Sequence, residues 1–428
     1  MTRVFVVWDD SHLWGLLVLR FLRALNVPHG ILRALDIAEG ALSGKSGQPG
    51  ADAPALLIAP GGWARGRALR LGGAGLSAIR EFVAGGGNYL GFCGGAGLAL
   101  TSARPGESLG LCPWGRMGFA GRLQHFLSGD VRLGLAEASA LIPPGPSELL
   151  AQVWWPAQFA PSANADDGVE VLARYADLGP DFWVADLALS RFPEETLSDW
   201  ENLYGLQVRP DFLAGRPAVV SGRYGQGRYV LSYPHLETPD SPEANHWLTH
   251  ILCELAAEDC PETATVPPWR VGADEVLWDD PALLAAKAAL EKAITLGQDH
   301  LLLFWRNPWL LGWRRGVPGP GINSVYALIC EALASRPTGA ALDYWRGHAE
   351  EFSGLARIFC QGLSGLLLAE RLDMTVRQTP GVDGADDVFA KNLREMRAAL
   401  FGPPPAAGGV CGQLLGLLEE LCAGLWKR

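Results

Sequence analysis

A cysteine at the apex of a glycine-rich turn is the residue best suited to chemistry in this chain. Cys93 lies in Gly91-Phe-Cys-Gly-Gly95, between the apolar segment Asn88-Tyr-Leu90 and the start of a small-residue helix. Gly-x-nucleophile-x-Gly is the pattern of a nucleophile elbow, whose apex residue has a strained backbone and whose glycines avoid the neighbouring strand and helix. The helix N-terminus would favour a thiolate. The segment therefore predicts a cysteine nucleophile; the alternative is a small buried residue in a tight turn.

Two residues late in the chain could support this thiol. His235 ends a strand-like run and could take the thiol proton, and Glu237 projects to the same side if the backbone is extended. The carboxylate could then orient the imidazole and stabilise its cation. An oxyanion hole needs backbone N–H groups free of side chains, and we expect them at Gly61 or Gly62 and at Gly94. A salt bridge at a strand end is the alternative for the histidine and glutamate.

Other side chains could line the same site. We consider Asp9, which ends the first strand, together with Trp155 and Gln158 as candidate substrate-binding residues. Core packing of the tryptophan, and a helix start at the aspartate, are the alternatives. His246 and His250 lie four residues apart on one helix but lack a clear set of four ligands, so we predict no metal site.

The first hundred residues alternate between strands and helices. Strands are expected at residues 4–8, 31–37, 55–59 and 88–92, and helices at 12–25 and 76–83. Apolar strands buried on both faces predict a doubly wound parallel α/β sheet. In such sheets ligands bind at the carboxyl ends of the strands, where Asp9, Gly61 and Cys93 would gather. From about residue 110 to 212 the periodicity loosens into short β-like segments.

Three motifs together resemble the class I glutamine amidotransferase-like superfamily: Pro-Gly-Gly62 after a strand, Gly-Phe-Cys93-Gly-Gly, and Tyr-Pro-His235-Leu-Glu237. Within it the chain is most similar to the biotin-protein ligase N-terminal domain, over roughly residues 1 to 255. That similarity rests on Gly-Gly-Asn-Tyr-Leu-Gly-Phe-Cys-Gly-Gly-Ala96, Ser128-Gly-Asp130, Val153-Trp-Trp155 and Arg223-Tyr-Gly-Gln-Gly-Arg-Tyr-Val230. The resemblance implies a Cys93–His235–Glu237 triad on a flavodoxin-like sheet.

The chain departs from both families in informative places. Glutaminases of the superfamily usually carry Gly-His-Gln or Gly-Met-Gln soon after the cysteine, whereas this chain has Gly95-Ala-Gly97. The resemblance therefore does not carry glutamine over as the substrate. The Gly-Arg-Gly-Arg-x-Gly nucleotide loop of biotin ligases is missing, so we predict that the chain is not a biotin ligase.

The composition changes after the first 260 residues. We expect an amidotransferase-like domain over residues 1–260, a linker over 261–280 that begins Pro-Glu-Thr-Ala-Thr-Val-Pro-Pro, and an all-α domain of unknown role over 281–428. In the last expected helix, residues 410–426, apolar side chains form one stripe. That helix is expected to pack on its own domain.

Charge and cysteine usage limit the partners and the compartment. The net charge of −11 over 428 residues, without a lysine and arginine cluster, argues against a nucleic-acid-binding surface. The eight cysteines show no paired or metal-finger spacing, which is typical of reduced thiols in the cytoplasm. Charged residues interrupt the longest apolar stretches, so we predict no membrane span.

The sequence therefore predicts a thiol hydrolase or amidase that acts on a small amide or ester and needs no cofactor. The alternative is a non-catalytic module that binds a small molecule and reports it to a partner. The helical domain could also mediate contact with another protein or self-association.

Overall fold

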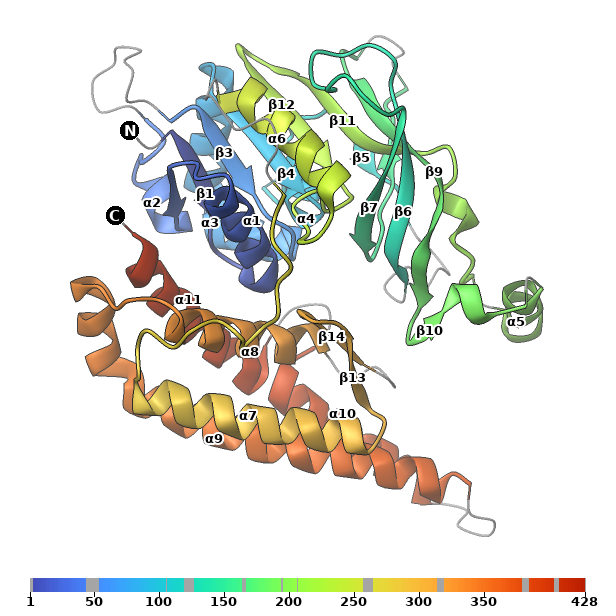
Figure 1. Cartoon of the computed structure of the whole chain (residues 1–428), viewed down its shortest axis with the longest axis vertical. Coiled ribbons are helices and arrows are strands. Elements are labelled where there is room, and N and C mark those ends of the chain that lie inside the picture. The colour runs from blue at the N-terminus through green and yellow to red at the C-terminus, as the bar shows by residue number, and fades with distance from the viewer. Residues whose placement is uncertain are drawn as a thin grey trace. The chain divides into compact units, whose positions relative to one another are not determined.

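The computed structural model describes residues 3–43, 54–104, 106–118, 127–163, 167–193, 195–205, 207–256, 265–313, 319–378, 385–403 and 408–427. The chain divides into two compact units, Met1–Pro268 and Trp269–Arg428. Figure 1 shows an α/β first unit and a largely helical second unit.

Five parallel strands form the centre of the first unit, in the order β2-β1-β3-β4-β12. These strands are β1 (Val4–Val7), β2 (His29–Leu32), β3 (Leu56–Ala59), β4 (Asn88–Phe92) and β12 (Gly227–Ser232). The order is that of flavodoxin-like sheets, and it confirms the predicted doubly wound fold.

Helices cover both faces of this parallel sheet, which explains why its strands are apolar almost throughout. The helices are α1 (His12–Ala24), α2 (Ala34–Ala38), α3 (Ala64–Ala84), α4 (Gly94–Ala99) and α6 (Pro242–Ala256). Alternate strand residues such as Leu57, Tyr89 and Leu231 pack with residues of α2, α3 and α4 in one core cluster. The helices α1 and α6 lie on the other face, toward the viewer in Figure 1.

The sheet continues beyond β12 as an antiparallel half, in the order β12-β11-β9-β6-β7. Its strands are β6 (Leu127–Leu135), β7 (Glu148–Trp154), β9 (Glu170–Val184) and β11 (Pro217–Tyr224), and the short β10 (Leu187–Ala188) pairs with β9. Two further short strands, β5 (Gly115–Arg116) and β8 (Phe159–Ala160), pair with each other in a separate two-stranded sheet. The sheet is therefore mixed rather than purely parallel, and the loosely periodic region contributes long strands. The helix α5 (Thr196–Tyr204) follows β10.

The far strand of the antiparallel half returns to the parallel half. Gln152 of β7 forms an isolated antiparallel bridge with His235, which follows β12. The backbone N–H of His235 donates to the carbonyl of Gln152 at 2.7 Å. The bridge joins the two halves of the sheet at the predicted histidine.

The second unit is helical, with one hairpin that the sequence pattern did not predict. Its helices are α7 (Pro281–Asp299), α8 (Gly319–Leu333), α9 (Gly339–Val376), α10 (Ala385–Phe401) and α11 (Gly409–Trp426), and its strands are β13 (Leu303–Asn307) and β14 (Leu310–Trp313). The Asn307 side chain turns the hairpin, because its oxygen accepts from the backbone N–H groups of Trp309 and Leu310.

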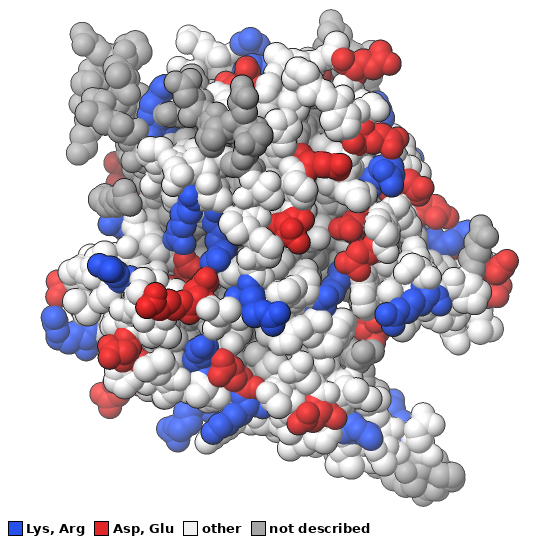
Figure 2. Space-filling model, in the orientation of Figure 1, with Lys and Arg blue, Asp and Glu red and all other residues white. Residues whose placement is uncertain are grey.

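Among the described helices, α9 alone is long and apolar enough to cross a membrane. The core helix of a soluble protein passes the same test, so one such helix is weak evidence for a membrane span. On the face shown in Figure 2, acidic and basic side chains are interspersed, and neither sign forms a continuous field over the described residues.

Candidate active site

The elbow has the strained geometry that its sequence predicts. Cys93 lies between β4 and α4 with φ 47° and ψ −104°, a region that non-glycine residues rarely occupy. The residue is partly exposed. Its backbone N–H donates to the Ser232 carbonyl at 2.7 Å, and its carbonyl accepts from Gly97 at 2.9 Å. The apex is thus tied to both the neighbouring strand β12 and its own helix.

Glycines surround the apex because backbone occupies the space that a side chain would need. A Cβ on Gly94 would lie 1.9 Å from the Gly62 carbonyl oxygen, and one on Gly95 would lie 1.9 Å from the Ala59 carbonyl oxygen. A Cβ on Gly91 would lie 2.7 Å from the backbone of Gly95. Real Cβ atoms do not approach so closely, so each of these positions requires glycine.

The predicted histidine and glutamate form a buried pair. Nδ1 of His235 lies 2.7 Å from Oε1 of Glu237, and both side chains are almost fully buried. Hydrogen bonds from neighbouring side chains fix the segment between them: Thr238 Oγ1 donates to the His235 carbonyl, and Asn245 Nδ2 donates to the Leu236 carbonyl. The pair is rigid, and Nε2 is the ring nitrogen left for a thiol.

Electrostatics link this pair to the elbow. Burial disfavours the charged imidazole, but the Glu237 carboxylate and then the Cys93 thiol outweigh it and raise the pKa of His235 to about 10. Within the described residues, Nε2 makes no hydrogen bond of ordinary geometry. Sγ of Cys93 lies 4.0 Å from the carbonyl of Trp154, the residue whose ring contacts the imidazole. A protonated His235 would stabilise a thiolate.

Two tryptophans enclose the imidazole. The rings of Trp14 and Trp154 lie 4.9 and 4.8 Å from the His235 ring, and 4.9 Å from each other. They come from α1 and from the end of β7, so both halves of the mixed sheet contribute to the site. The indoles shield the ring from water, which strengthens its attraction to Glu237.

The predicted oxyanion loop lies beside both the elbow and the histidine. A Cβ on Gly61 would lie 2.7 Å from Cε1 of His235, and the Gly62 carbonyl abuts Gly94. Gly62 has φ 120°, which favours glycine. Gly94 is the first residue of α4, so its N–H has no acceptor within its own helix. The structure brings together Cys93, His235 and the glycines, as well as Glu237.

The three predicted substrate-binding residues, Asp9, Gln158 and Trp155, have different surroundings from one another. Both carboxylate oxygens of Asp9 accept hydrogen bonds, one from the Arg33 guanidinium at 2.7 and 2.8 Å and the other from the Ala34 N–H, so this carboxylate joins the end of β1 to the start of α2. The Gln158 side chain is buried and donates to the Phe212 carbonyl. Trp155 is 37% exposed, and its neighbour in sequence is the tryptophan that contacts His235.

Several residues near the thiol were missed by the sequence reasoning. Tyr175 and Tyr233 are buried, and burial raises the pKa of both hydroxyls, with a further contribution from Cys93. Tyr233 belongs to the Tyr-Pro-His motif, which could have identified it. Trp14 lies within the helix expected at residues 12–25, and no motif singled it out.

The site combines a flavodoxin-like sheet, a cysteine elbow and a buried His–Glu pair, which is the arrangement that the sequence resemblance implied. The family described as "Biotin-protein ligase, N terminal" matches residues 41–103, which include β3, α3, β4 and the elbow. This match confirms the predicted resemblance. A search of curated proteins found no match.

Solved structures with similar folds have low sequence identity to this chain. A GMP synthase subunit from Thermoplasma acidophilum is 13% identical, with a TM-score of 0.36 over 60% of this chain and 95% of that one. PurLQS of Thermotoga maritima is 15% identical, with a TM-score of 0.36 over 59% and 99%. A ThuA-like protein of Bacteroides uniformis is 13% identical, with a TM-score of 0.38 over 61% and 94%.

Proposed function

We propose that the first unit is a thiol hydrolase or amidase that acts on a small amide or ester. The observation that carries the proposal is the buried His235–Glu237 pair facing a partly exposed cysteine on a strained elbow. A sealed thiol, or one without a histidine contact, would instead suit a module that only binds ligands. The strained backbone at the apex holds the Cys93 thiol in an accessible position rather than packed in the core.

The reaction follows from the roles of these groups. The Cys93 thiolate attacks the carbonyl carbon, forming a C–S bond and an oxyanion held by the N–H groups of Gly61 or Gly62 and Gly94. The His235 imidazolium gives its proton to the leaving amine or alcohol as the C–N or C–O bond breaks. Water, deprotonated by the now neutral imidazole, attacks the thioester and releases the acid and the thiol.

The test is the reactivity of Cys93 in the intact chain. We expect iodoacetamide to alkylate Cys93 at pH 6 faster than Cys253, a partly exposed thiol on α6 that serves as an internal reference. The variant His235→Ala should lose this preference by at least about tenfold. Peptide mass spectrometry gives both rates in one sample. A Cys93 that reacts no faster than Cys253 in the folded wild type would refute the proposal.

The state of the thiols bears on the compartment. The seven cysteines within the described residues form no disulfide with one another, which supports a reducing compartment such as the cytoplasm. A substrate screen should therefore begin with small cytoplasmic amides and esters, assayed with the variant Cys93→Ser as the inactive reference.

A further inference from the structure

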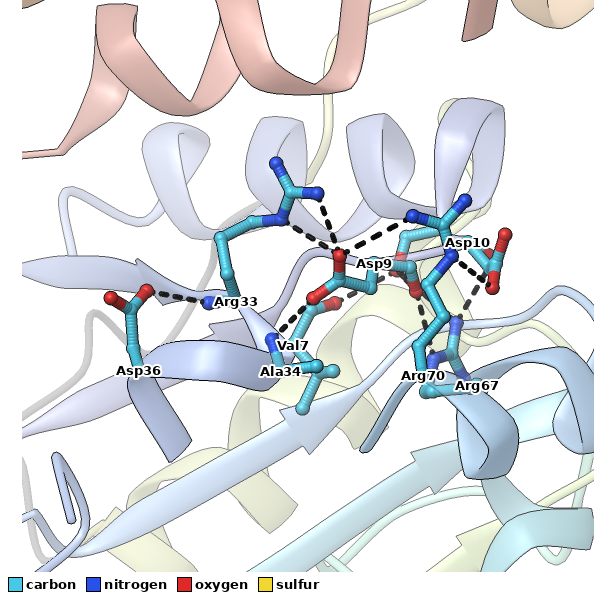
Figure 3. Close-up of polar contacts among 9 residues, drawn as sticks. Val7, Asp9, Asp10, Arg33, Ala34, Asp36, Arg67 and Arg70 are labelled. Carbon is cyan, nitrogen blue, oxygen red and sulfur yellow. Dashed lines mark hydrogen bonds and ion pairs between the residues drawn. The ribbon is translucent and has the colours of Figure 1, made fainter. Parts of the chain in front are cut away.

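A fully buried arginine lies directly behind the oxyanion loop. Arg67 is in the first turn of α3, and its side chain has no exposure to solvent. Arginine is rarely buried without partners, because removing its charge from water is costly. Its guanidinium is accordingly held by hydrogen bonds to backbone carbonyls. Figure 3 shows the bonds that reach Asp9 and Asp10.

Two of these bonds go to the oxyanion loop itself. Nη1 of Arg67 donates to the Pro60 carbonyl at 2.8 Å, and Nη2 donates to the Gly61 carbonyl at 2.9 Å. In a trans peptide the C=O and the N–H of the same unit point in opposite directions. With both carbonyls turned toward the guanidinium, the N–H groups of Gly61 and Gly62 must point away from it.

The same guanidinium fixes the loop after β1. Nε donates to the Asp9 carbonyl at 3.2 Å, and Nη2 lies 3.1 Å from Ser11 Oγ and 3.4 Å from the Asp10 carbonyl. The Asp10 carbonyl is also the atom nearest to a Cβ on Gly62, at 2.5 Å. One side chain therefore ties together the two loops that lie at the carboxyl ends of β1 and β3.

We infer that Arg67 is a positioning residue that holds the oxyanion loop in its acylation-competent orientation. The inference rests on the proposed function and extends it to a residue that contacts neither the thiol nor the imidazole. The planar guanidinium offers five fixed donors, so it can bind several carbonyls in one geometry, which a lysine cannot do. Its charge also polarises both peptide groups in the sense that favours an oxyanion at their N–H ends.

Two reagents separate this role from a general structural one. Iodoacetamide alkylates Cys93 by displacement and forms no oxyanion, whereas p-nitrophenyl acetate acylates the thiol through a tetrahedral oxyanion. We expect Arg67→Met to lower the acylation rate of Cys93 by about 100-fold or more, and the alkylation rate by no more than about twofold. Arg67→Lys should give an intermediate loss of acylation, because it retains one cation and fewer donors. Rates come from nitrophenolate release and peptide mass spectrometry.

The matched control is Arg70→Met on the same helix, whose side chain is 43% exposed and pairs with Asp10. It should leave both rates within about twofold of the wild type. If Arg67→Met does not fold, as judged by circular dichroism, the comparison rests on Arg67→Lys. Equal losses of acylation and alkylation, or no loss of either, would overturn the inference. So would a wild-type Cys93 that is alkylated but not acylated, whereas a Cys93 that resists alkylation would refute the proposed function itself.

Discussion

Replacing Glu237 by glutamine should change the pH dependence of Cys93 alkylation. The carboxylate lies 2.7 Å from His235 Nδ1, and both side chains are buried. Two unit charges about 4 Å apart at the effective dielectric of a protein attract by about 4 kcal/mol, or about 3 pKa units. Glutamine keeps the shape and an acceptor for Nδ1–H but removes this attraction.

The expected result follows from the sign of that shift. Without the charge, burial still lowers the pKa of His235, which should fall well below its wild-type value of about 10. In the wild type the imidazolium persists from pH 6 to 9, so its attraction for a Cys93 thiolate should be constant over that range. In Glu237→Gln the imidazolium gives up its proton at a lower pH, so a thiolate loses its partner within this range, and alkylation at pH 8 should be at least about threefold slower than in the wild type.

The assay is the second-order rate of iodoacetamide labelling between pH 6 and 9.5, with Cys253 as the reference in each sample. Glu81→Gln, an exposed position on α3, is the matched control and should behave as the wild type. A Glu237→Gln variant whose Cys93 profile coincides with that of the wild type would refute the electrostatic reasoning, because the carboxylate would then have no influence on the thiol–imidazole pair.

Three further predictions concern stability. Gly94→Ala places a Cβ 1.9 Å from the Gly62 carbonyl oxygen and should lower the free energy of unfolding by at least about 2 kcal/mol, measured by urea titration; an unchanged midpoint would contradict the described contact. Asp9→Asn removes the charge that pairs with Arg33 and should lower the free energy of unfolding by about 1–3 kcal/mol. It should leave the alkylation rate of Cys93 unchanged, and a slower rate would show that Asp9 contributes to the site. Because the pKa of His235 is raised in the folded state, its stabilising effect is complete below about pH 6.5 and is lost as the pH rises toward 10. The wild type should therefore lose up to about 1.4 kcal/mol per pH unit across this window, a slope that His235→Ala should lack in urea titrations at stepped pH.

Local motifs explain how much of the fold and the site could be predicted. The elbow and the His-x-Glu segment are short, and their geometry is dictated by glycines and by neighbouring backbone, so Cys93 and His235 could be identified from spacing alone. Asp9 could not be placed in this way, since its partner Arg33 lies 24 residues further along the chain. The contact of Trp154 with His235 could not be predicted from spacing either, because it depends on β7 returning to the parallel half.

The antiparallel half was hard to predict for a related reason. Its strands are long, but register shifts interrupt β9 where it pairs with β6 and β11, so the alternation of buried and exposed residues is broken. In the second unit, the apolar run before Trp313 fits a helix or a strand equally well. The hairpin there is decided by the Asn307 turn, which a pattern of apolar residues does not report.

The bridge between Gln152 and His235 has a consequence for how the protein folds. It pairs residues 83 positions apart and gives the outer strand β7 a backbone partner on the side that would otherwise be an open edge. Contacts between such distant segments form only after the intervening chain has been ordered. The imidazole therefore reaches its place when β7 pairs with the segment that follows β12. The rate at which the Cys93 thiol becomes reactive during refolding would then report when folding is complete.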